Sequence, residues 1–285
     1  MTVTQTDISA IEQEVAERSR PFQVLREQIH RVVVGQEELL DGLVMGLLCN
    51  GHVLIEGVPG LAKTTAVSTL SKCISTGFQR IQFTPDLLPA DIVGTLVYRP
   101  SDGEFTVKKG PIFSNLVLAD EINRAPAKVQ SAMLEAMQER QVTIGDETFP
   151  MAEPFLVMAT QNPIEQEGTY PLPEAQLDRF MFMIKVDYPG EEEEFQILKA
   201  YTGNEGARPD PVLGAGEILD MQRAVRDMPV ADHILRYAER LVRVTRPGSE
   251  EALEFCSKWL TWGAGPRAGL NLVLAAKANA LLRGE

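Results

Sequence analysis

The sequence HVLIEGVPGLAKTT, residues 52–65, decides the fold of this chain. His52–Glu56 is a short apolar run that predicts a buried strand, and the strand must end at the turn that follows. Helical spacing begins at Lys63 and predicts a helix to Ile74. Gly57 and Gly60 let the backbone wrap so that its N–H groups point inward, and the positive end of the helix adds to that field. A strand, a glycine-rich turn and a helix that opens on Lys-Thr predict a phosphate-binding loop.

Two side chains of this loop carry its chemistry. We expect Lys63 to reach the β- and γ-phosphates of a nucleoside triphosphate and the Thr64 hydroxyl to ligate Mg²⁺. The usual glycine before the lysine is Ala62 here. Alanine fits if that position is already helical, because only a positive φ makes a Cβ costly. The alternative interpretation is a Gly-Pro turn that happens to precede a Lys-Thr helix.

A second motif, LVLADE at residues 116–121, is an apolar strand that ends in two acids. Asp120 is expected to hold Mg²⁺, and Glu121 to polarise the attacking water as general base. In isolation the segment is equally typical of a strand followed by a solvated acidic turn. A third strand, Phe155–Thr160, ends in Gln161-Asn162, and an amide there would lie beside the γ-phosphate. That third signal is weak alone, because Asn is common at strand ends and turns.

Strand and helix signals alternate through the first two thirds of the chain. Further strands are expected at Arg80–Phe83 and Phe180–Val186, and a helix at Ala127–Gln138. Strands separated by helices predict an α/β fold with a parallel sheet and helices on both faces. Leu96–Lys108 and Gln141–Phe149 alternate around turn residues and predict hairpins that project from this body.

The pattern becomes helical after Pro189-Gly190. We therefore predict a flexible leader at residues 1–20, an α/β nucleotide-binding domain at 21–189 and a helical lid domain at 190–285. Within the last segment, helices are expected at Glu191–Tyr201, Ile218–Arg226, Ala231–Thr245 and Ala264–Leu282.

Charge and composition argue against several classes of protein. The net charge of −13 argues against a general affinity for nucleic acid, which needs a basic face to displace phosphate counterions. The three cysteines and the three histidines (His30, His52 and His233) are scattered and lack the spacing of metal ligands. The sequence has no apolar run long enough for a membrane span and no signal core, so a cytoplasmic protein is expected.

These segments together resemble the MoxR family of AAA+ ATPases. The resemblance runs from Val34-Gly35-Gln36 almost to the end, and five strings in the right order make it specific. They are GVPGLAKT (57–64), ADEINRA (119–125), ATQNPI (159–164), LPEAQLDRF (172–180) and GPRA (265–268). The resemblance implies a three-layer P-loop fold with a C-terminal all-helical lid. Relatives continue past the position of Leu282, so the lid is expected to be either truncated or short.

The resemblance also implies roles for individual residues. Asn162 matches the first sensor and Arg267 the second, and Arg179 matches the finger that reaches a neighbouring subunit's site. Each arginine has a plainer alternative, a local ion pair for Arg179 and local helix packing for Arg267; Arg124 is a second finger candidate. The expected nucleotide-binding residues are Val34, Gly35 and Gln36 around the adenine, then Gly57, Val58, Pro59, Gly60, Leu61, Ala62, Lys63, Thr64 and Thr65, with Arg267.

The resemblance implies that the protein is an Mg²⁺-dependent ATP hydrolase. Its expected task is to remodel a client protein, to mature it or to load metal into it. A client or adaptor with a von Willebrand factor A domain and a homo-oligomeric, hexameric ring are expected. The hairpins match inserts near the pore, with Tyr98 and Phe105 as candidate contacts. Two alternatives stay open: the motor subunit of a metal (magnesium) chelatase, and a nucleotide-gated binding scaffold. Glu121 speaks against the scaffold, which can dispense with a base.

Overall fold

The computed structural model describes residues 5–101, 103–164, 168–202 and 208–284. The chain divides into two compact units, Pro21–Leu219 and a second unit of Met1–Arg20 with Asp220–Glu285. The division near residue 189 rests on the change of sequence pattern and stays a prediction. No described helix combines the length and the apolarity that a bilayer crossing requires.

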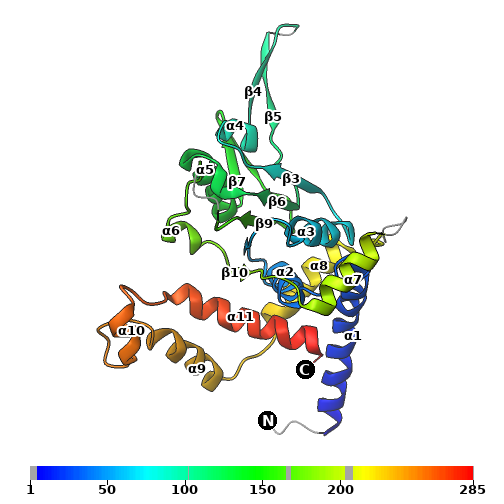
Figure 1. The fold of residues 1–285 in the computed structure, drawn as a ribbon, viewed down its shortest axis with the longest axis vertical. Helices are drawn as coiled ribbons and strands as arrows, with labels where there is room; N and C mark the ends of the chain where they lie inside the picture. The colour runs from blue at the N-terminus through cyan, green and yellow to red at the C-terminus, as the bar shows by residue number, and fades with distance from the viewer. Residues whose placement is uncertain (1–4, 102, 165–167, 203–207, 285) are drawn as a thin grey trace. The chain divides into compact units, whose positions relative to one another are not determined.

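A five-stranded parallel sheet forms the centre of the larger unit (Figure 1). Its strand order is β10-β1-β9-β6-β3, so the predicted α/β fold with a parallel sheet is confirmed. All of its strands run parallel, so their carboxyl ends lie at the same edge of the sheet. The bounds are β1 Val53–Glu56, β3 Phe78–Gln82, β6 Leu116–Asp120, β9 Leu156–Gln161 and β10 Phe182–Lys185.

Helices cover both faces of this sheet. On one face, α5 (Ala127–Glu139) contributes Met133 to a buried cluster that also contains Leu54 and Val157. Successive strand residues point to opposite faces, so the neighbouring Val53 and Leu156 face the other way. They lie against Gly46 of α2 (Glu37–Cys49), where an added Cβ would meet both side chains. The sheet is therefore buried on both sides, as its uninterrupted apolar strands require.

The remaining elements of the larger unit are short or peripheral. They are α3 Lys63–Lys72, β2 Ile74–Ser75, α4 Pro89–Val93, η1 Ile122–Arg124, α6 Glu174–Leu177, α7 Glu191–Tyr201 and β11 Leu213–Gly214, which pairs with β2. The helix α1 spans Gln5–His30, so the segment expected as a leader is helical from Gln5 onward. The sequence pattern did not reveal α4, α6, β2 or β11, because elements of two to five residues carry too little periodicity.

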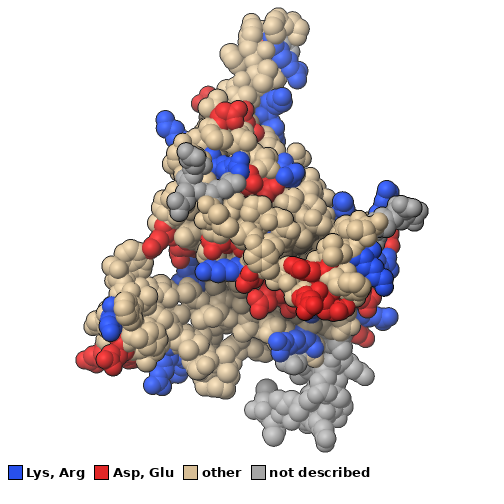
Figure 2. All heavy atoms as spheres, in the orientation of Figure 1, with Lys and Arg blue, Asp and Glu red and all other residues tan. Residues whose placement is uncertain are grey.

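Both predicted hairpins are present. β4 (Gly94–Arg99) pairs with β5 (Glu104–Lys109), and this hairpin projects from the sheet (Figure 1). β7 (Gln141–Ile144) and β8 (Glu147–Pro150) form the second. Lys and Arg side chains lie along the projecting hairpin (Figure 2). Its Tyr98 and Phe105 rings contact each other, with centroids 5.2 Å apart, yet both stay more than half exposed.

The smaller unit contains helices from the C-terminal part of the chain: α8 (Ala215–Asp227, which begins in the larger unit), α9 (Asp232–Arg243), α10 (Glu254–Trp259) and α11 (Pro266–Arg283). α9 contacts α11, and Lys277 donates a 2.9 Å hydrogen bond to the carbonyl of Arg226. The Arg246 guanidinium holds the loop before α11 through the carbonyl of Ala264, at 3.0 Å. α10 was not expected from the sequence.

His52 joins three elements of the larger unit from a fully buried position. Its Nδ1 accepts the N–H of Val157 at 3.0 Å, and its Nε2 therefore carries the proton and donates to the carbonyl of Met137 at 3.1 Å. Burial, aided by the charge of Arg140, lowers the pKa of His52 from 6.5 to about 4. The imidazole is therefore a structural group, as its scattered position in the sequence suggested.

The lowered pKa predicts acid sensitivity. The folded state disfavours the imidazolium, so the stability from a neutral His52 is complete above pH 6.5 and is lost as pH falls toward 4. The shift corresponds to about 3 kcal/mol. Between pH 7 and pH 4, wild type is expected to lose about that much more unfolding free energy than His52→Gln, whose amide keeps both hydrogen bonds without titrating. Urea unfolding at both pH values measures the loss of unfolding free energy. His233→Gln, at an exposed position, is the control and should behave like wild type. Equal losses in wild type and His52→Gln would contradict the prediction.

Candidate active site at the carboxyl edge of the sheet

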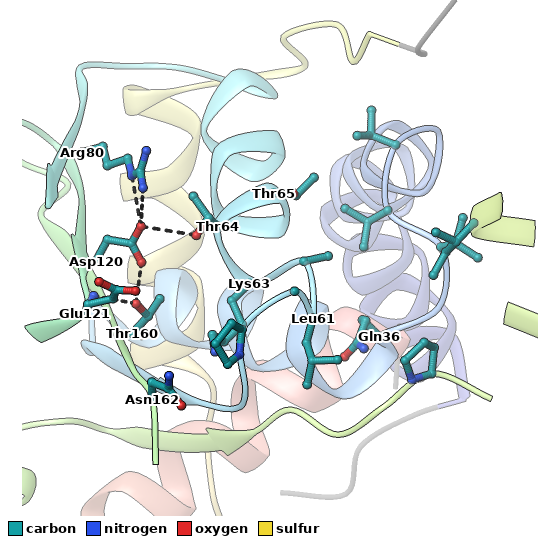
Figure 3. Close-up of a pocket in the computed structure, with 18 of the residues that line it drawn as sticks. Gln36, Leu61, Lys63, Thr64, Thr65, Arg80, Asp120, Glu121, Thr160 and Asn162 are labelled. Carbon is teal, nitrogen blue, oxygen red and sulfur yellow. Dashed lines mark hydrogen bonds and ion pairs between the residues drawn. The ribbon is translucent and has the colours of Figure 1, made fainter. Parts of the chain in front are cut away.

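A pocket of about 510 Å³ opens at the carboxyl edge of the central sheet (Figure 3). Its volume lies in the range of small-molecule sites. It is lined by the loop between β1 and α3, by the ends of β3, β6 and β9, and by α7. Of the residues expected at the site, those that line it are Val34, Gln36, Pro59, Gly60, Leu61, Ala62, Lys63, Thr64, Thr65, Asp120, Glu121 and Asn162.

The loop between β1 and α3 wraps tightly, and two glycines explain how. A side chain at Gly57 would approach the carbonyl oxygen of Val186 to 2.8 Å, so only glycine allows β1 to end this close to β10. Gly60 has a φ of +87°, which glycine adopts without cost. Gly57 and Val58 are not among the residues that line the pocket.

Ala62 departs from the sequence-based expectation. Its φ of 57° and ψ of 15° place it in the left-handed region, and α3 begins only at the next residue. The condition under which alanine fits without cost, a helical backbone at position 62, is therefore not met. A residue with a Cβ costs roughly 1–2 kcal/mol in this conformation, so the loop holds local strain at the point where it turns into the helix.

Lys63 points back into the loop that it follows. Its ammonium donates to the carbonyl of Gly57 and, at 2.9 Å, to that of Val58. Burial lowers the pKa of Lys63, and the carboxylates of Asp120 and Glu121 oppose that shift. The two carbonyl oxygens accept hydrogen bonds from the ammonium, as phosphate oxygens would. Carbonyl and phosphate oxygens are both acceptors that compensate a desolvated cation.

The Asp120 carboxylate is buried at the end of β6 and uses both oxygens. Oδ1 accepts the hydroxyl of Thr160 at 2.6 Å. Oδ2 accepts the hydroxyl of Thr64 at 3.4 Å and two N–H groups of Arg80, at 3.0 and 2.7 Å. Thr64 and Asp120 thus meet across the pocket from α3 and β6, as Figure 3 shows.

This donor set fits Mg²⁺. A hydroxyl and one carboxylate that meet in a pocket are the oxygen ligands that Mg²⁺ takes from a protein when phosphates and water supply the rest. In the described part of the chain there is no group of three His, Cys, Asp or Glu side chains that would hold a metal alone. A metal ion held by Thr64 and Asp120 would therefore also need a bound phosphate group as a ligand.

Glu121 directly follows Asp120 and has an unusual backbone. Its φ of 58° lies in the left-handed region, and its N–H donates to the Thr160 hydroxyl at 2.9 Å. The same hydroxyl donates to Asp120, so Thr160 fixes both acids. The Glu121 Oε2 accepts from Gln82 at 2.9 Å and pairs with Arg124 at 3.0 Å. Strain at a non-glycine residue in a pocket is typical of functional sites.

Asn162 follows β9 and is buried beside the two acids. Its Oδ1 accepts the N–H of Ile164 at 3.2 Å, and its backbone carbonyl accepts the side chain of Asn123, also at 3.2 Å. These contacts fix the turn and leave the Asn162 amide nitrogen to face the pocket. Gln161 lines the pocket as well and donates to Glu56 at 2.6 Å.

The far end of the pocket is apolar and is built by two segments. Val34 and Gln36 come from the segment between α1 and α2, and the Gln36 side chain donates to the carbonyl of Asp187 at 3.3 Å. Ile197 and Tyr201 of α7 form the opposite wall, and the Tyr201 hydroxyl donates to the carbonyl of Val32 at 2.7 Å. Gly35 does not line the pocket; at its φ of 65° the carboxylate of Glu193 covers its α-carbon.

The three arginines have different surroundings. Arg124 pairs with Glu121 of its own chain. Arg179 is half-buried and follows α6. Arg267 lies in the first turn of α11, in the smaller unit. The trans-acting role of Arg179 and the sensor role of Arg267 stay predictions.

Sequence reasoning missed Arg80, Gln82, Thr160, Ile197 and Tyr201. A strand at Arg80–Phe83 was expected. Arg80 and Gln82 are two residues apart in it, and this spacing is the one signal that their side chains lie on the same face of the strand. That this face meets the acids of β6 depends on β3 pairing with β6, in register Gln82 with Asp120. Strand order is a property of the whole sheet and has no local signature.

Comparison with known proteins agrees with this geometry. Residues 52–182 match the family model described as "ATPase family associated with various cellular activities (AAA)". "Chaperone MoxR1" of Mycobacterium tuberculosis is 50% identical over 258 residues, which cover 90% of this chain and 68% of that protein. "Protein MoxR" of Paracoccus denitrificans is 29% identical over 90% of this chain and 80% of its own length.

A crystal structure of a protein from Cytophaga hutchinsonii superposes with a TM-score of 0.88. It is 44% identical in sequence, and the match covers 97% of this chain and 84% of that one. The fold and much of the sequence are thus shared over most of both chains. This chain belongs to the MoxR family of AAA ATPases.

Proposed function

We propose that this chain hydrolyses ATP with Mg²⁺ as cofactor and uses the reaction to remodel, mature or load metal into a client protein. The observation that carries the hydrolase is the convergence in one pocket of Lys63 and Thr64, Asp120 and Glu121, and Asn162, from three strand ends. Arg179 and Arg267 are proposed to complete the site as trans finger and second sensor. Family membership supports ATP as the substrate.

The roles of the residues follow from their positions. The backbone N–H groups before Lys63 and the N-terminus of α3 bind the phosphates, and the Lys63 ammonium exchanges loop carbonyls for phosphate oxygens. Mg²⁺, when bound, neutralises charge on the phosphates and orients them. Val34 and Gln36, with Ile197 and Tyr201 of α7, take the adenine.

Glu121 and Asn162 act on the attacking water. The water oxygen forms a bond to the γ-phosphorus, the bond from that phosphorus to the β–γ bridging oxygen breaks, and Glu121 accepts the proton. Gln82 and Arg124 both hold Oε2, so we assign the proton to Oε1. The Asn162 amide orients the water from the other side.

Thr160 is expected to position Glu121 and Asp120. Thr160→Val keeps the shape but removes the acceptor of the Glu121 N–H and the donor to Asp120, so kcat should fall by about tenfold or more. Thr160→Ser retains the hydroxyl and should stay within a few-fold of wild type. Steady-state phosphate release gives kcat and KM for both variants. An unchanged kcat in Thr160→Val, with the protein folded, would exclude this role.

The proposed interaction with a client protein is supported by family membership and by the exposed surface of one hairpin. The relative at 50% identity is named a chaperone, and the hairpin β4–β5 exposes two aromatic rings and basic side chains (Figure 2). We propose this hairpin as a client contact and a protein with a von Willebrand factor A domain as client or adaptor. Co-purification with a Glu121→Gln chain, which should retain ATP and its client, tests this; recovery of no such domain would contradict that part.

An oligomer is proposed because Arg179 is assigned to the site of a neighbouring subunit, and the family resemblance favours a hexameric ring. Mixing Arg179→Ala chains with Lys63→Ala chains should restore activity, because some interfaces then combine an intact loop with an intact finger. The mixed sample is compared with each variant alone at the same total concentration, after light scattering has shown equal assembly. Assembly without any restoration would place the finger elsewhere, with Arg124 as the next candidate.

A further inference from the structure

The guanidinium of Arg80 occupies the same carboxylate oxygen that a metal would need. Asp120 offers two oxygens, and Thr160 uses Oδ1 at 2.6 Å. Oδ2 lies 3.4 Å from the Thr64 hydroxyl, so a cation held by Thr64 and Asp120 would bind Oδ2. Nε and Nη2 of Arg80 already donate to that oxygen at 3.0 and 2.7 Å (Figure 3).

Arg80 is well placed to act as a counter-ion. Asp120 is buried, and a buried carboxylate without compensation is costly. The Arg80 side chain is half exposed, so it can leave for solvent without losing its own hydration. A second bond from Nη2 to Gln82 Oε1, at 2.7 Å, orients the guanidinium toward Asp120. The pair thus sets a half-exposed cation against a buried anion.

We propose that Arg80 is a competing counter-ion for Asp120, which it neutralises in the metal-free state and must release before a divalent cation binds between Thr64 and Asp120. Two positive charges cannot share one carboxylate oxygen without repulsion, so binding of the metal and release of Arg80 are coupled. The free energy needed to release Arg80 lowers the affinity of the site for the metal. This inference rests on the metal site of the proposed function.

The experiment measures metal affinity directly. Mn²⁺ serves as the probe, with saturating ADP, and free Mn²⁺ is followed by electron paramagnetic resonance. Arg80→Ala removes the competitor, so the Mn²⁺ dissociation constant should fall by about five- to tenfold. Arg80→Gln, which keeps a hydrogen-bonding side chain without charge, should behave in the same way. Arg80→Lys keeps the charge and should stay closer to wild type. Arg236→Ala, which removes an exposed arginine from α9, should match wild type.

A second measurement needs no metal. In EDTA, Arg80→Ala and Arg80→Gln should melt below wild type, because Asp120 loses its compensation. The loss should shrink when ADP and Mn²⁺ are added. A merely structural arginine would instead weaken Mn²⁺ binding. Equal or weaker Mn²⁺ affinity in both neutral variants overturns the role of Arg80 while leaving the metal site standing. Failure of wild type to bind Mn²⁺ with ADP overturns the metal site itself, and this inference with it.

Discussion

Replacing Glu121 by glutamine is expected to lower kcat by about 100- to 10,000-fold, the usual contribution of a general base. The amide has nearly the shape of the carboxylate but cannot accept the proton of the attacking water. ATP affinity should change little, because Lys63, Thr64 and the loop amides make the proposed phosphate contacts. Phosphate release under saturating ATP gives kcat, and titration with a fluorescent ATP analogue gives affinity.

The matched control is Glu135→Gln, the same chemical change at an exposed position of α5. It should leave both quantities unchanged. A Glu121→Gln chain with wild-type turnover would show that another group takes the proton. A chain that loses ATP affinity as strongly as turnover would show that Glu121 acts mainly on binding.

The sequence predicted the framework because each part of it has a local signal. The strand of residues 53–56, the glycine turn and the helix from Lys63 are recognisable from hydrophobic runs and turn residues alone. The acids after β6 were found in the same way, because parallel strands place their functional groups at their carboxyl ends. The hairpins followed from alternation around Gly103 and Gly145, both of which have positive φ.

What the sequence could not predict depends on neighbours that are distant in the chain. Arg80 is an ordinary exposed-strand residue until β3 is placed beside β6, where it meets Asp120 forty residues later. Tyr201 forms a pocket wall only because α7 returns to the segment at Val32. The backbone conformation of Ala62 could not be predicted for a different reason. The turn imposes a left-handed backbone at position 62, and alanine is not a residue type that indicates one.

The second large effect is expected at Lys63. Lys63→Ala should weaken ATP binding by about 10- to 100-fold, the range for one charge-assisted hydrogen bond to a phosphate. The loss in kcat/KM should be greater still, because the ammonium also opposes charge that develops on the γ-phosphate during the reaction. Isothermal titration with ATP gives the affinity, and initial rates at low ATP give kcat/KM.

Two further variants separate the charge from its geometry. Lys72→Ala removes an exposed lysine from the other end of α3 and should change neither affinity nor rate. Lys63→Arg keeps the charge, but a planar guanidinium cannot enter the loop as a compact ammonium does, so activity should stay low. Lys63 is partly desolvated and is compensated by two loop carbonyls, so removing it should cost the free protein little stability. A Lys63→Ala chain that binds ATP as tightly as wild type would mean that the phosphates lie outside this loop, and the positions proposed for Glu121 and Asn162 relative to the γ-phosphate would then be wrong as well.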